Sequence, residues 1–384
     1  MARIHTFDGE LAGLIDIKSL SLDELTELLL QQGHPRFRGK QVYKWVWQKG
    51  IRDFMEMSNV SKAARAQLAE VFHIDFLDSE LQLESEDGTR KFVWKLRDGH
   101  HIESVLIPDP GIEGHSKPRM TLCMSSQVGC AMACSFCLTG DLGLVRNLRP
   151  SEILNQALQV QQALPEGQRL TNLVFMGMGE PLHNLTNLLK SLRVLLDDEA
   201  LNFSHRKITV STVGLVPQMQ KLAAETPVNL AVSLNATTDQ RRLEVMPITR
   251  RYGLETLMEG CRDFPLPHAK RITFEYVMMH GFNDSWDDAA RLVQLMRGVK
   301  SKVNLIAYNE NPERQILRPP EDHVKAFQHY LVSRGIQCSI RSTRGVDISA
   351  ACGQLGRATD GMRIEEAGVA GPTISLDPPF CSDT

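Results

Sequence analysis

The spacing of apolar residues changes along the chain, and these changes mark regions of different secondary structure. Near the N-terminus, leucines from Leu22 to Leu29 recur at helical spacing behind Ser21 and Glu24, which form a capping box. This pattern predicts a small helical accessory domain over residues 1–80. Two further helices are predicted in it, over residues 39–49 and 61–72.

In residues 81–107, apolar and polar side chains alternate. Phe92, Trp94 and Leu96 lie at every second position, as on a strand with one buried face, and Asp87-Gly88 is a hairpin turn signal. Two prolines and two glycines in residues 108–117 then indicate a linker. We therefore expect a β-hairpin and linker over residues 81–118.

From residue 119 onward, short apolar runs alternate with helical patterns, which is typical of parallel strands joined by crossover helices. The alternation predicts an α/β fold, an incomplete (β/α)6-type TIM barrel over residues 119–345. A doubly wound open sheet is the alternative, and in both folds functional residues gather where the strands end. A tail, residues 359–384, is rich in Gly, Pro, Ser and Ala, and is expected to be flexible. The predicted strands are 120–125, 172–177, 207–213, 228–234, 271–279, 303–308 and 337–342, and the predicted helices are 151–163, 185–198, 215–224, 253–263, 286–297 and 321–334.

Composition narrows the class of protein. The 384 residues carry a formal net charge of -3, with 42% hydrophobic and 23% charged residues, which is the balance of an ordinary globular protein. No apolar run approaches the roughly 18 residues that cross a bilayer. The first residues also lack a basic stretch followed by an apolar one. We therefore expect a cytoplasmic protein with no membrane partner.

The cysteines suggest a site for metal or redox chemistry. Eight cysteines in a cytoplasmic chain of this length do not indicate a disulfide framework. Cys130, Cys134 and Cys137 form a CxxxCxxC motif after the first predicted barrel strand. Three cysteines on one loop can bind three irons of a 4Fe–4S cluster and leave the fourth iron open. The spacing alone leaves two alternatives: a zinc site completed by Cys123 or His115, and a redox loop.

A glycine-rich segment follows the second predicted barrel strand. Gly177 and Gly179 allow backbone carbonyls to face a bound ammonium group with no Cβ in the way, and Glu180 adds negative charge. Taken alone, such a segment is more often a turn. The segment follows CxxxCxxC by one strand–helix unit.

Together, the two motifs resemble the radical S-adenosylmethionine superfamily, and Phe136 matches the aromatic residue usual before the third cysteine. The chain further resembles the RlmN family of dual-specificity RNA methyltransferases, from the N-terminal helices to about Leu355. This implies a 4Fe–4S cluster on the three motif cysteines and S-adenosylmethionine as cosubstrate. The closer resemblance is carried by Arg119–Cys130, Gly177–Pro181, Ser211–Gly214, Pro247-Ile248, Glu275–Met278, Val303–Ile306 and Arg344–Leu355.

The resemblance implies methylation of carbon 2 of an adenine, in 23S rRNA and in tRNA beside the anticodon. That carbon lies between two ring nitrogens and is electron-poor, so it does not attack the methyl group of S-adenosylmethionine as an amine would. A carbon radical is able to add to it instead. Two cosubstrate molecules are implied per turnover. The first methylates Cys352, and the second yields a 5′-deoxyadenosyl radical that takes hydrogen from the S-methyl group. The resulting carbon radical adds to adenine and leaves an RNA–protein crosslink.

Two further residues are assigned by the same resemblance. Cys123 helps to resolve the crosslink, and a disulfide bond with Cys352 forms as the base departs, so the two sulfurs need to come within bonding reach. We therefore expect the catalytic cysteine loop, residues 346–358, to fold over the barrel mouth. Glu103 matches the glutamate that accepts the C2 proton. Without the resemblance, each cysteine reads as a small buried side chain and Glu103 as a solvated strand residue.

Polar groups at successive strand ends are the expected contacts to S-adenosylmethionine. An asparagine stands at position 235, where the family usually has histidine, and its amide can still form hydrogen bonds. The resemblance assigns this role to Gly179, Glu180, Ser211, Ser233, Leu234, Asn235 and Asn309.

RNA affinity in a slightly acidic chain requires local positive charge. Residues 34–67 hold eight Lys or Arg against two acidic residues, a local net charge of +6, with aromatic residues between them. Basic groups for phosphates and aromatic rings for bases suit structured RNA. A solvated helix face with Val42, Trp45 and Val46 in the core is the alternative. The aromatics are Phe37, Tyr43, Trp45 and Trp47, and further basic candidates are Arg241, Arg242, Arg250 and Arg251.

The expected partners are 23S rRNA, tRNA and an electron donor such as flavodoxin with its reductase, and the chain is expected to be a monomer. The related C8-adenine methyltransferases of antibiotic resistance are the nearest alternative, and Gly179–Pro181 favours the C2 enzyme. An alternative of another class is a non-catalytic RNA-binding protein with a structural zinc site. That alternative leaves Cys123, Cys352 and the glycine-rich segment without a role.

Overall fold

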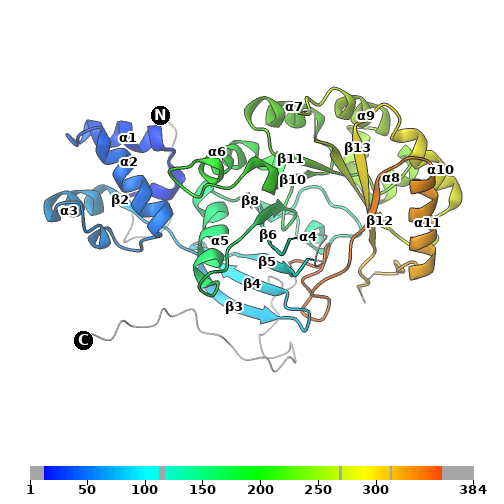
Figure 1. The fold of residues 1–384 in the computed structure, drawn as a ribbon, viewed down its shortest axis with the longest axis horizontal. Coiled ribbons are helices and arrows are strands. Elements are labelled where there is room, and N and C mark those ends of the chain that lie inside the picture. Colours follow the sequence, from blue (N-terminus) through cyan, green and yellow to red (C-terminus); the bar gives the residue numbers. More distant parts are fainter. Residues whose placement is uncertain (1–12, 112–116, 268–269, 312–313, 357–384) are drawn as a thin grey trace.

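A ten-stranded open sheet forms the centre of the computed structural model, which describes residues 13–111, 117–267, 270–311 and 314–356. Along the sheet, the strands run in the order β14-β13-β12-β11-β10-β9-β6-β5-β4-β3 (Figure 1). From β6 to β14, each neighbouring pair is parallel. These parallel strands are β6 (Arg119–Cys123), β9 (Asn172–Phe175), β10 (Ile208–Thr212), β11 (Asn229–Ser233), β12 (Ile272–Met278), β13 (Ser301–Ala307) and β14 (Cys338–Ile340).

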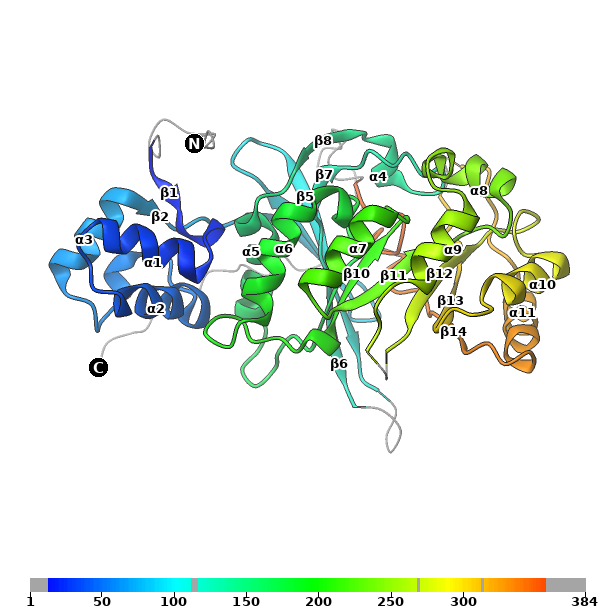
Figure 2. The same ribbon diagram turned by 90° about the horizontal axis from the view of Figure 1, so that it is seen from above.

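Helices connect the parallel strands and cover the outside of the sheet (Figures 1 and 2). The incomplete (β/α) barrel expected from the sequence is therefore confirmed, because the strands are parallel and the sheet stays open at β14 and β3. The connecting helices are α5 (Pro150–Ala163), α6 (Leu185–Leu196), α7 (Val216–Glu225), α8 (Asp239–Val245), α9 (Leu254–Arg262), α10 (Trp286–Leu295) and α11 (Glu321–Ser333).

The β-hairpin region belongs to the same sheet. Strand β5 (His101–Asp109) pairs antiparallel with β6, and β4 (Arg90–Lys95) and β3 (Asp78–Glu84) extend the sheet beyond it. The hairpin strands thus continue the barrel sheet, and β5 runs into the first part of the expected linker. Residues 112–116 of that linker and the tail from residue 357 lie outside the described residues.

The N-terminal helices pack at one end of the molecule, beyond α5 (Figure 2). They are joined by a short parallel pair, β1 (Ile15–Asp16) with β2 (Phe72–His73). The helices are α1 (Leu22–Gln31), α2 (Phe37–Lys44), its π-helical continuation Trp45–Lys49 and α3 (Lys62–Val71). Single 3-10 turns occupy Ile17–Ser19, Phe54–Glu56, Pro181–Asn184, His205–Lys207 and Pro247–Arg250.

Helix α5 joins these helices to the barrel through polar groups. Lys18 is fully buried, and its Nζ donates to the carbonyl of Asp75 (2.9 Å) and to Oδ1 of Asn155 on α5 (2.8 Å). Gln159, one turn further along α5, pairs with both the N–H and the carbonyl of Leu77 (2.8 and 2.9 Å). Because both partners of every contact are buried, each would leave an unsatisfied polar group if it were broken.

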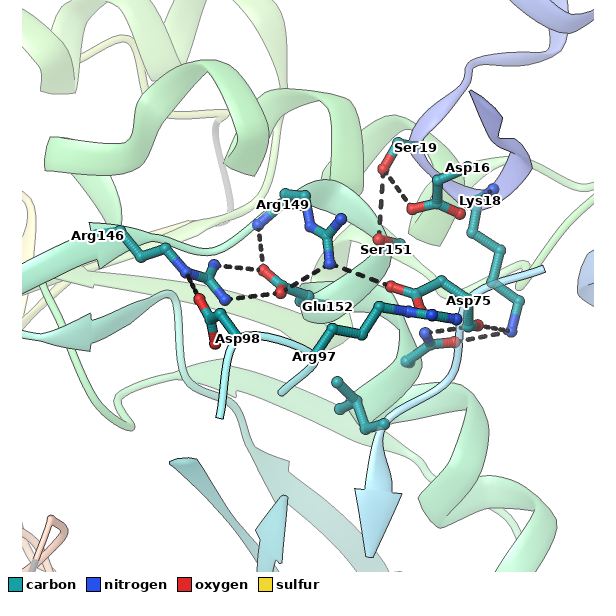
Figure 3. Close-up of polar contacts among 12 residues, drawn as sticks. Asp16, Lys18, Ser19, Asp75, Arg97, Asp98, Arg146, Arg149, Ser151 and Glu152 are labelled. Carbon is teal, nitrogen blue, oxygen red and sulfur yellow. Dashed lines mark hydrogen bonds and ion pairs between the residues drawn. The ribbon is translucent and has the colours of Figure 1, made fainter. Parts of the chain in front are cut away.

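Ion pairs surround the start of α5 (Figure 3). Asp75 accepts from Arg97 (2.5 Å) and Arg149 (3.3 Å). Glu152 binds Arg146 through both carboxylate oxygens (2.8 and 2.9 Å), and Arg146 also pairs with Asp98 in the β4–β5 turn. This network connects the N-terminal helices, the hairpin and the start of α5.

No helix of the described residues has the length and apolar character needed to span a membrane.

Candidate active site

The loop that carries CxxxCxxC leaves the sheet through a small antiparallel ribbon of β7 (Gln127–Gly129) and β8 (Leu144–Asn147). Gly129 has φ +71°, and a Cβ there would lie 1.8 Å from the carbonyl oxygen of Gly143. The N–H of Cys130 donates to that same carbonyl (2.8 Å). The first cysteine therefore follows a turn that only glycine fits. The short helix α4 (Leu138–Asp141) begins directly after the third cysteine.

The three motif cysteines line one cavity at the strand ends. Their thiols are removed from water, and burial raises the pKa of Cys130 to about 12 and also raises the pKa values of Cys134 and Cys137. Because a bound metal stabilises the thiolate form, iron binding would remove the protons that burial otherwise favours.

The three motif cysteines suit an iron–sulfur cluster, because they line one cavity. No group of three or more His, Cys, Asp or Glu side chains within the described ranges converges where one metal ion could bind. In a 4Fe–4S cluster, each thiolate binds a different iron around a shared cavity. The arrangement of Cys130, Cys134 and Cys137 fits the cluster. His115, the other zinc ligand considered, lies outside the described residues.

The glycine-rich segment closes against the strand that precedes the cysteine loop. A Cβ on Gly177 would lie 2.7 Å from the carbonyl oxygen of Met124, and one on Gly179 (φ +97°) would lie 2.5 Å from Cβ of Gln127. Gln127 also accepts from the N–H of Glu180 (2.8 Å) through its side-chain carbonyl. Both glycines are therefore required by close packing as well as by the open cavity beside them.

Glu180 lies in the cavity and joins two strand ends. Its carboxylate accepts from the N–H groups of Leu182 (3.1 Å) and Val213 (2.9 Å). Burial raises the pKa of this carboxyl to about 7, against these hydrogen bonds, which lower it. The side chain therefore changes charge near neutral pH in the absence of a cationic ligand.

Most of the residues expected to contact S-adenosylmethionine line this cavity, namely Gly179, Glu180, Ser211, Ser233, Asn235 and Asn309. Leu234 is outside its lining and is fully buried, with its N–H bound to the carbonyl of Glu275 (3.0 Å). Asn235 adopts a left-handed conformation (φ 57°), and its Oδ1 accepts from the N–H of Val277 (2.9 Å). Asparagine tolerates this conformation better than most residues, and its carbonyl ties β11 to β12.

The loop that carries Cys352 reaches back to the cysteine motif. The N–H of Leu138 donates to the carbonyl of Gly353 (2.9 Å), and Thr139 donates to the carbonyl of Leu355 (2.8 Å). Cys352 consequently lines the same cavity as the three motif cysteines. This agrees with the expectation that the loop folds over the barrel mouth.

Cys123, Cys352 and Arg341 lie close enough together to influence one another's charge, and Arg341 was not among the residues predicted from the sequence. Burial raises the pKa of Cys123 to about 12; Cys352 raises it further and Arg341 lowers it. Arg341 follows β14, and it lines the cavity together with Glu275 of β12. The signal in the sequence was only its position in the last predicted strand, residues 337–342. Both cysteines are free thiols here, so the predicted disulfide bond is not present in this structure.

Glu103 lies behind the cavity and does not line it. It is fully buried on β5, and its carboxylate is 3.5 Å from Nζ of Lys91. Lys91 also donates to the carbonyl of Ser349 (3.3 Å), three residues before Cys352. The structure therefore links Glu103 to the Cys352 loop through Lys91.

The basic segment of the N-terminal helices presents fewer aromatic rings than expected. Tyr43 and Trp47 are almost completely buried, because they lie on the helix face that packs against the core, and only Phe37 is largely exposed. Lys40 and Lys44 pair with Glu199 after α6 (2.8 and 2.7 Å). The interpretation of Tyr43 and Trp47 as base-stacking residues was wrong, whereas the basic residues are at the surface.

Arg242 was also predicted to contact RNA, and this prediction is wrong. Its side chain has no exposed surface, so it is unable to touch RNA. The adjacent Arg241 is partly exposed and stacks on the ring of Phe282 (5.5 Å).

This barrel, with three cysteines at its mouth and a glycine-rich strand end beside them, defines a radical S-adenosylmethionine enzyme, and the model of the radical SAM superfamily matches residues 124–293. That class uses a 4Fe–4S cluster and S-adenosylmethionine. The model of the ribosomal RNA large subunit methyltransferase N-terminal domain matches residues 15–74. The chain belongs to the RlmN family.

Individual relatives agree with this assignment over nearly the whole chain. It is 49% identical over 355 residues to the dual-specificity RNA methyltransferase RlmN of Geobacter sulfurreducens, covering 92% of this chain and 96% of that protein. It is 50% identical to the protein of the same name from Geotalea uraniireducens, covering 89% and 96%. The crystal structure of a radical SAM methyltransferase from Sphaerobacter thermophilus superimposes with a TM-score of 0.83 at 41% identity, covering 89% of this chain and 99% of that one.

Proposed function

We propose that this protein methylates carbon 2 of a specific adenine in 23S rRNA and in tRNA, with Cys352 as the carrier of the transferred carbon. The observation that supports this most directly is that Cys352 lines the same cavity as Cys130, Cys134 and Cys137. A thiol at that place is available to S-adenosylmethionine and to a base inserted beside it. The names of the RlmN relatives support RNA as the substrate.

The cluster, when bound, supplies the electron that turns S-adenosylmethionine into a source of carbon radicals. The residues around the cavity do the rest. Ser211, Ser233 and Asn309 offer polar groups to the cosubstrate at three strand ends. The thiolate of Cys352 attacks the methyl group of one cosubstrate molecule, forming a carbon–sulfur bond and releasing S-adenosylhomocysteine.

Release of the product is assigned to Cys123 and Glu103. The methyl carbon on Cys352 becomes bonded to adenine C2. The proton that C2 loses passes to Glu103, which the family resemblance assigns as its acceptor, although this side chain lies behind the cavity here. The carboxylate is held 3.5 Å from the ammonium of Lys91, and removal of this proton requires a base. The thiolate of Cys123 then attacks the sulfur of Cys352, so that the sulfur–carbon bond breaks and a disulfide forms. The released carbon takes up a proton to become the new methyl group, and the cluster, when bound, would accept the one electron left from the radical addition.

The domains divide this work. Residues 1–80 are proposed to bind RNA, residues 81–118 to bridge to the barrel, residues 119–345 to form the radical domain, residues 346–358 to carry the catalytic cysteine and residues 359–384 to be a flexible tail. The basic groups of the N-terminal helices provide phosphate contacts. A stacked adenine is unable to reach a buried cavity, so it flips out of its stack.

The remaining partners and the location follow from the same function. The enzyme acts as a monomer in the cytoplasm, where its RNA substrates are, and takes electrons from a donor such as flavodoxin with its reductase.

The deciding experiment is nucleoside mass spectrometry of 23S rRNA and tRNA from a strain that lacks this gene. Loss of 2-methyladenosine from both RNAs, restored by the wild-type gene and not by Cys352→Ala, is the expected result. Loss of 8-methyladenosine would instead assign the chain to the C8 enzymes. Unchanged nucleosides would refute methylation of these RNAs.

A further inference from the structure

Arg242 on α8 is a fully buried arginine whose contacts are all with neutral groups. It has no exposed surface. Its Nη2 donates to the carbonyls of Val213 (2.7 Å) and Ser233 (3.2 Å), and its Nε to the carbonyl of Leu234 (3.1 Å). Its Nη1 donates to Oγ1 of Thr249 (3.0 Å) and reaches the carbonyl of Tyr252 at 3.5 Å. The guanidinium is thus fully hydrogen-bonded by oxygens that carry no net charge.

This arrangement leaves a buried positive charge without a carboxylate partner. Within the described parts of the chain, neither Asp nor Glu forms an ion pair with Arg242, and nearby Asp239 instead caps α9 through the N–H of Leu254 (2.6 Å). Burial lowers the pKa of Arg242 to about 10, so the guanidinium stays charged at neutral pH. A buried charge is costly unless an opposite charge compensates it. Asp239 supplies part of that charge without forming an ion pair, since it raises the pKa of Arg242, and further negative charge nearby would stabilise the guanidinium.

The cysteine loop lies beside this guanidinium. The N–H of Ser135, next to Cys134, donates to the carbonyl of Val245 at the end of α8 (3.0 Å). Burial raises the pKa of Cys134, neighbouring cysteines and Glu180 raise it further, and Arg242 lowers it. Two of the carbonyl partners of Arg242, those of Val213 and Ser233, belong to residues that line the cavity with the three cysteines.

We propose that Arg242 is the charge partner of the iron–sulfur cluster: its guanidinium offsets the negative charge that three cysteine thiolates bring, and so raises the reduction potential of the cluster. A one-electron reduction adds negative charge to the site, and a fixed buried cation stabilises the reduced state more than the oxidised one. The same side chain is a positioning residue, because it holds the ends of β10 and β11 at the cosubstrate cavity. The proposal rests on the cluster alone and holds whichever RNA is methylated.

The test is a redox titration of the purified, cluster-loaded enzyme, with the reduced cluster followed by electron paramagnetic resonance. Arg242→Gln removes the charge and is expected to lower the midpoint potential. Arg242→Lys keeps the charge and is expected to stay near the wild-type value. Arg241→Gln, which removes the adjacent, partly exposed arginine of the same helix, is the matched control and is expected to leave the potential unchanged. An Arg242→Gln enzyme with full iron content and an unchanged potential would overturn the proposal.

Iron and sulfide content decides the case in which a variant assembles poorly. If charge is what matters, Arg242→Lys retains the cluster when Arg242→Gln loses it. If both variants lose the cluster to the same degree while their circular dichroism spectra stay native, the hydrogen bonds of the guanidinium are the important feature, and the assignment as a charge partner is wrong.

Discussion

The backbone N–H of Leu138 donates a 2.9 Å hydrogen bond to the carbonyl of Gly353. Leu138 directly follows the third motif cysteine, and Gly353 directly follows Cys352. One main-chain contact therefore brings together two segments that are more than 200 residues apart. Thr139 adds a second contact to Leu355 (2.8 Å), so the loop with Cys352 is fastened to the loop with the CxxxCxxC motif.

Replacement of Cys352 by alanine should abolish methylation and leave the cluster in place, because Cys352 is outside the CxxxCxxC motif. We expect activity to fall by at least on the order of a thousandfold, the scale of losing a covalent nucleophile. Mass spectrometry should find a methylated Cys352 peptide in the wild type and none in the variant. Cys338→Ala, which removes a partly exposed thiol on β14, is the control and should keep full activity. An active Cys352→Ala enzyme would disprove the carrier role.

Replacement of Cys123 by alanine should trap RNA on the protein. Without its thiol, the crosslink between Cys352 and adenine has no resolving sulfur, so a covalent adduct should accumulate in cells and migrate slowly in denaturing gels until nuclease is added. The double variant Cys123→Ala/Cys352→Ala should show no adduct. An adduct-free single variant with a loaded cluster would remove Cys123 from the mechanism.

Replacement of Gly179 by alanine should weaken both folding and cosubstrate binding. The new Cβ would lie 2.5 Å from Cβ of Gln127, at a φ of +97°, and we expect the free energy of unfolding to fall by about 3 kcal/mol. Gly167→Ala is a matched control, since its φ is +81° and nothing lies within 4 Å of its Cβ position; about 1 kcal/mol is expected there. Urea unfolding and S-adenosylmethionine titration measure the two effects. Equal losses in both variants would show that backbone strain alone is responsible.

The stability of the cluster-free protein should depend on pH through Glu180. Its pKa in the folded state is raised to about 7 from 4.5, so between these values the folded state binds more protons than the unfolded state. Stability should therefore be highest at or below about pH 4.5 and fall as pH rises to about 7. The size of this contribution is on the order of 3 kcal/mol. Glu180→Gln should flatten this part of the profile, as measured by chemical denaturation from pH 5 to 8. Parallel profiles for the two proteins would contradict the assignment.

The barrel strands could be predicted from the sequence because buried parallel strands are continuous apolar runs. The predicted strand 228–234, for example, corresponds to β11 at Asn229–Ser233. Helix α8 was missed because the residue that anchors it in the core is Arg242, which looks like a surface residue. The ribbon of β7 and β8 was also missed, since strands of three or four residues leave too short a pattern.

Local spacing was enough to find the CxxxCxxC motif and Gly179, whose chemistry depends on neighbours in the sequence. The approach of Cys123 to Cys352 came from the family resemblance, and the place of Arg341 beside them depends on tertiary contacts. Tyr43 and Trp47 are buried because they lie on the helix face that meets the core. That face could not be recognised from the sequence, because basic residues surround both aromatics.

The buried polar contacts of α5 set a rule for building chimeras from members of this family. Lys18 and Asn155 come from opposite sides of the junction between the N-terminal helices and the barrel, and they satisfy each other. A chimera that exchanges residues 1–77 alone would pack residues from another protein against Asn155 and Gln159. Any mismatch there would leave a buried side-chain amide without its hydrogen-bond partner. The transplantable unit is therefore the N-terminal helices together with α5, although the whole hairpin region, β6 and the CxxxCxxC motif lie between them in the sequence.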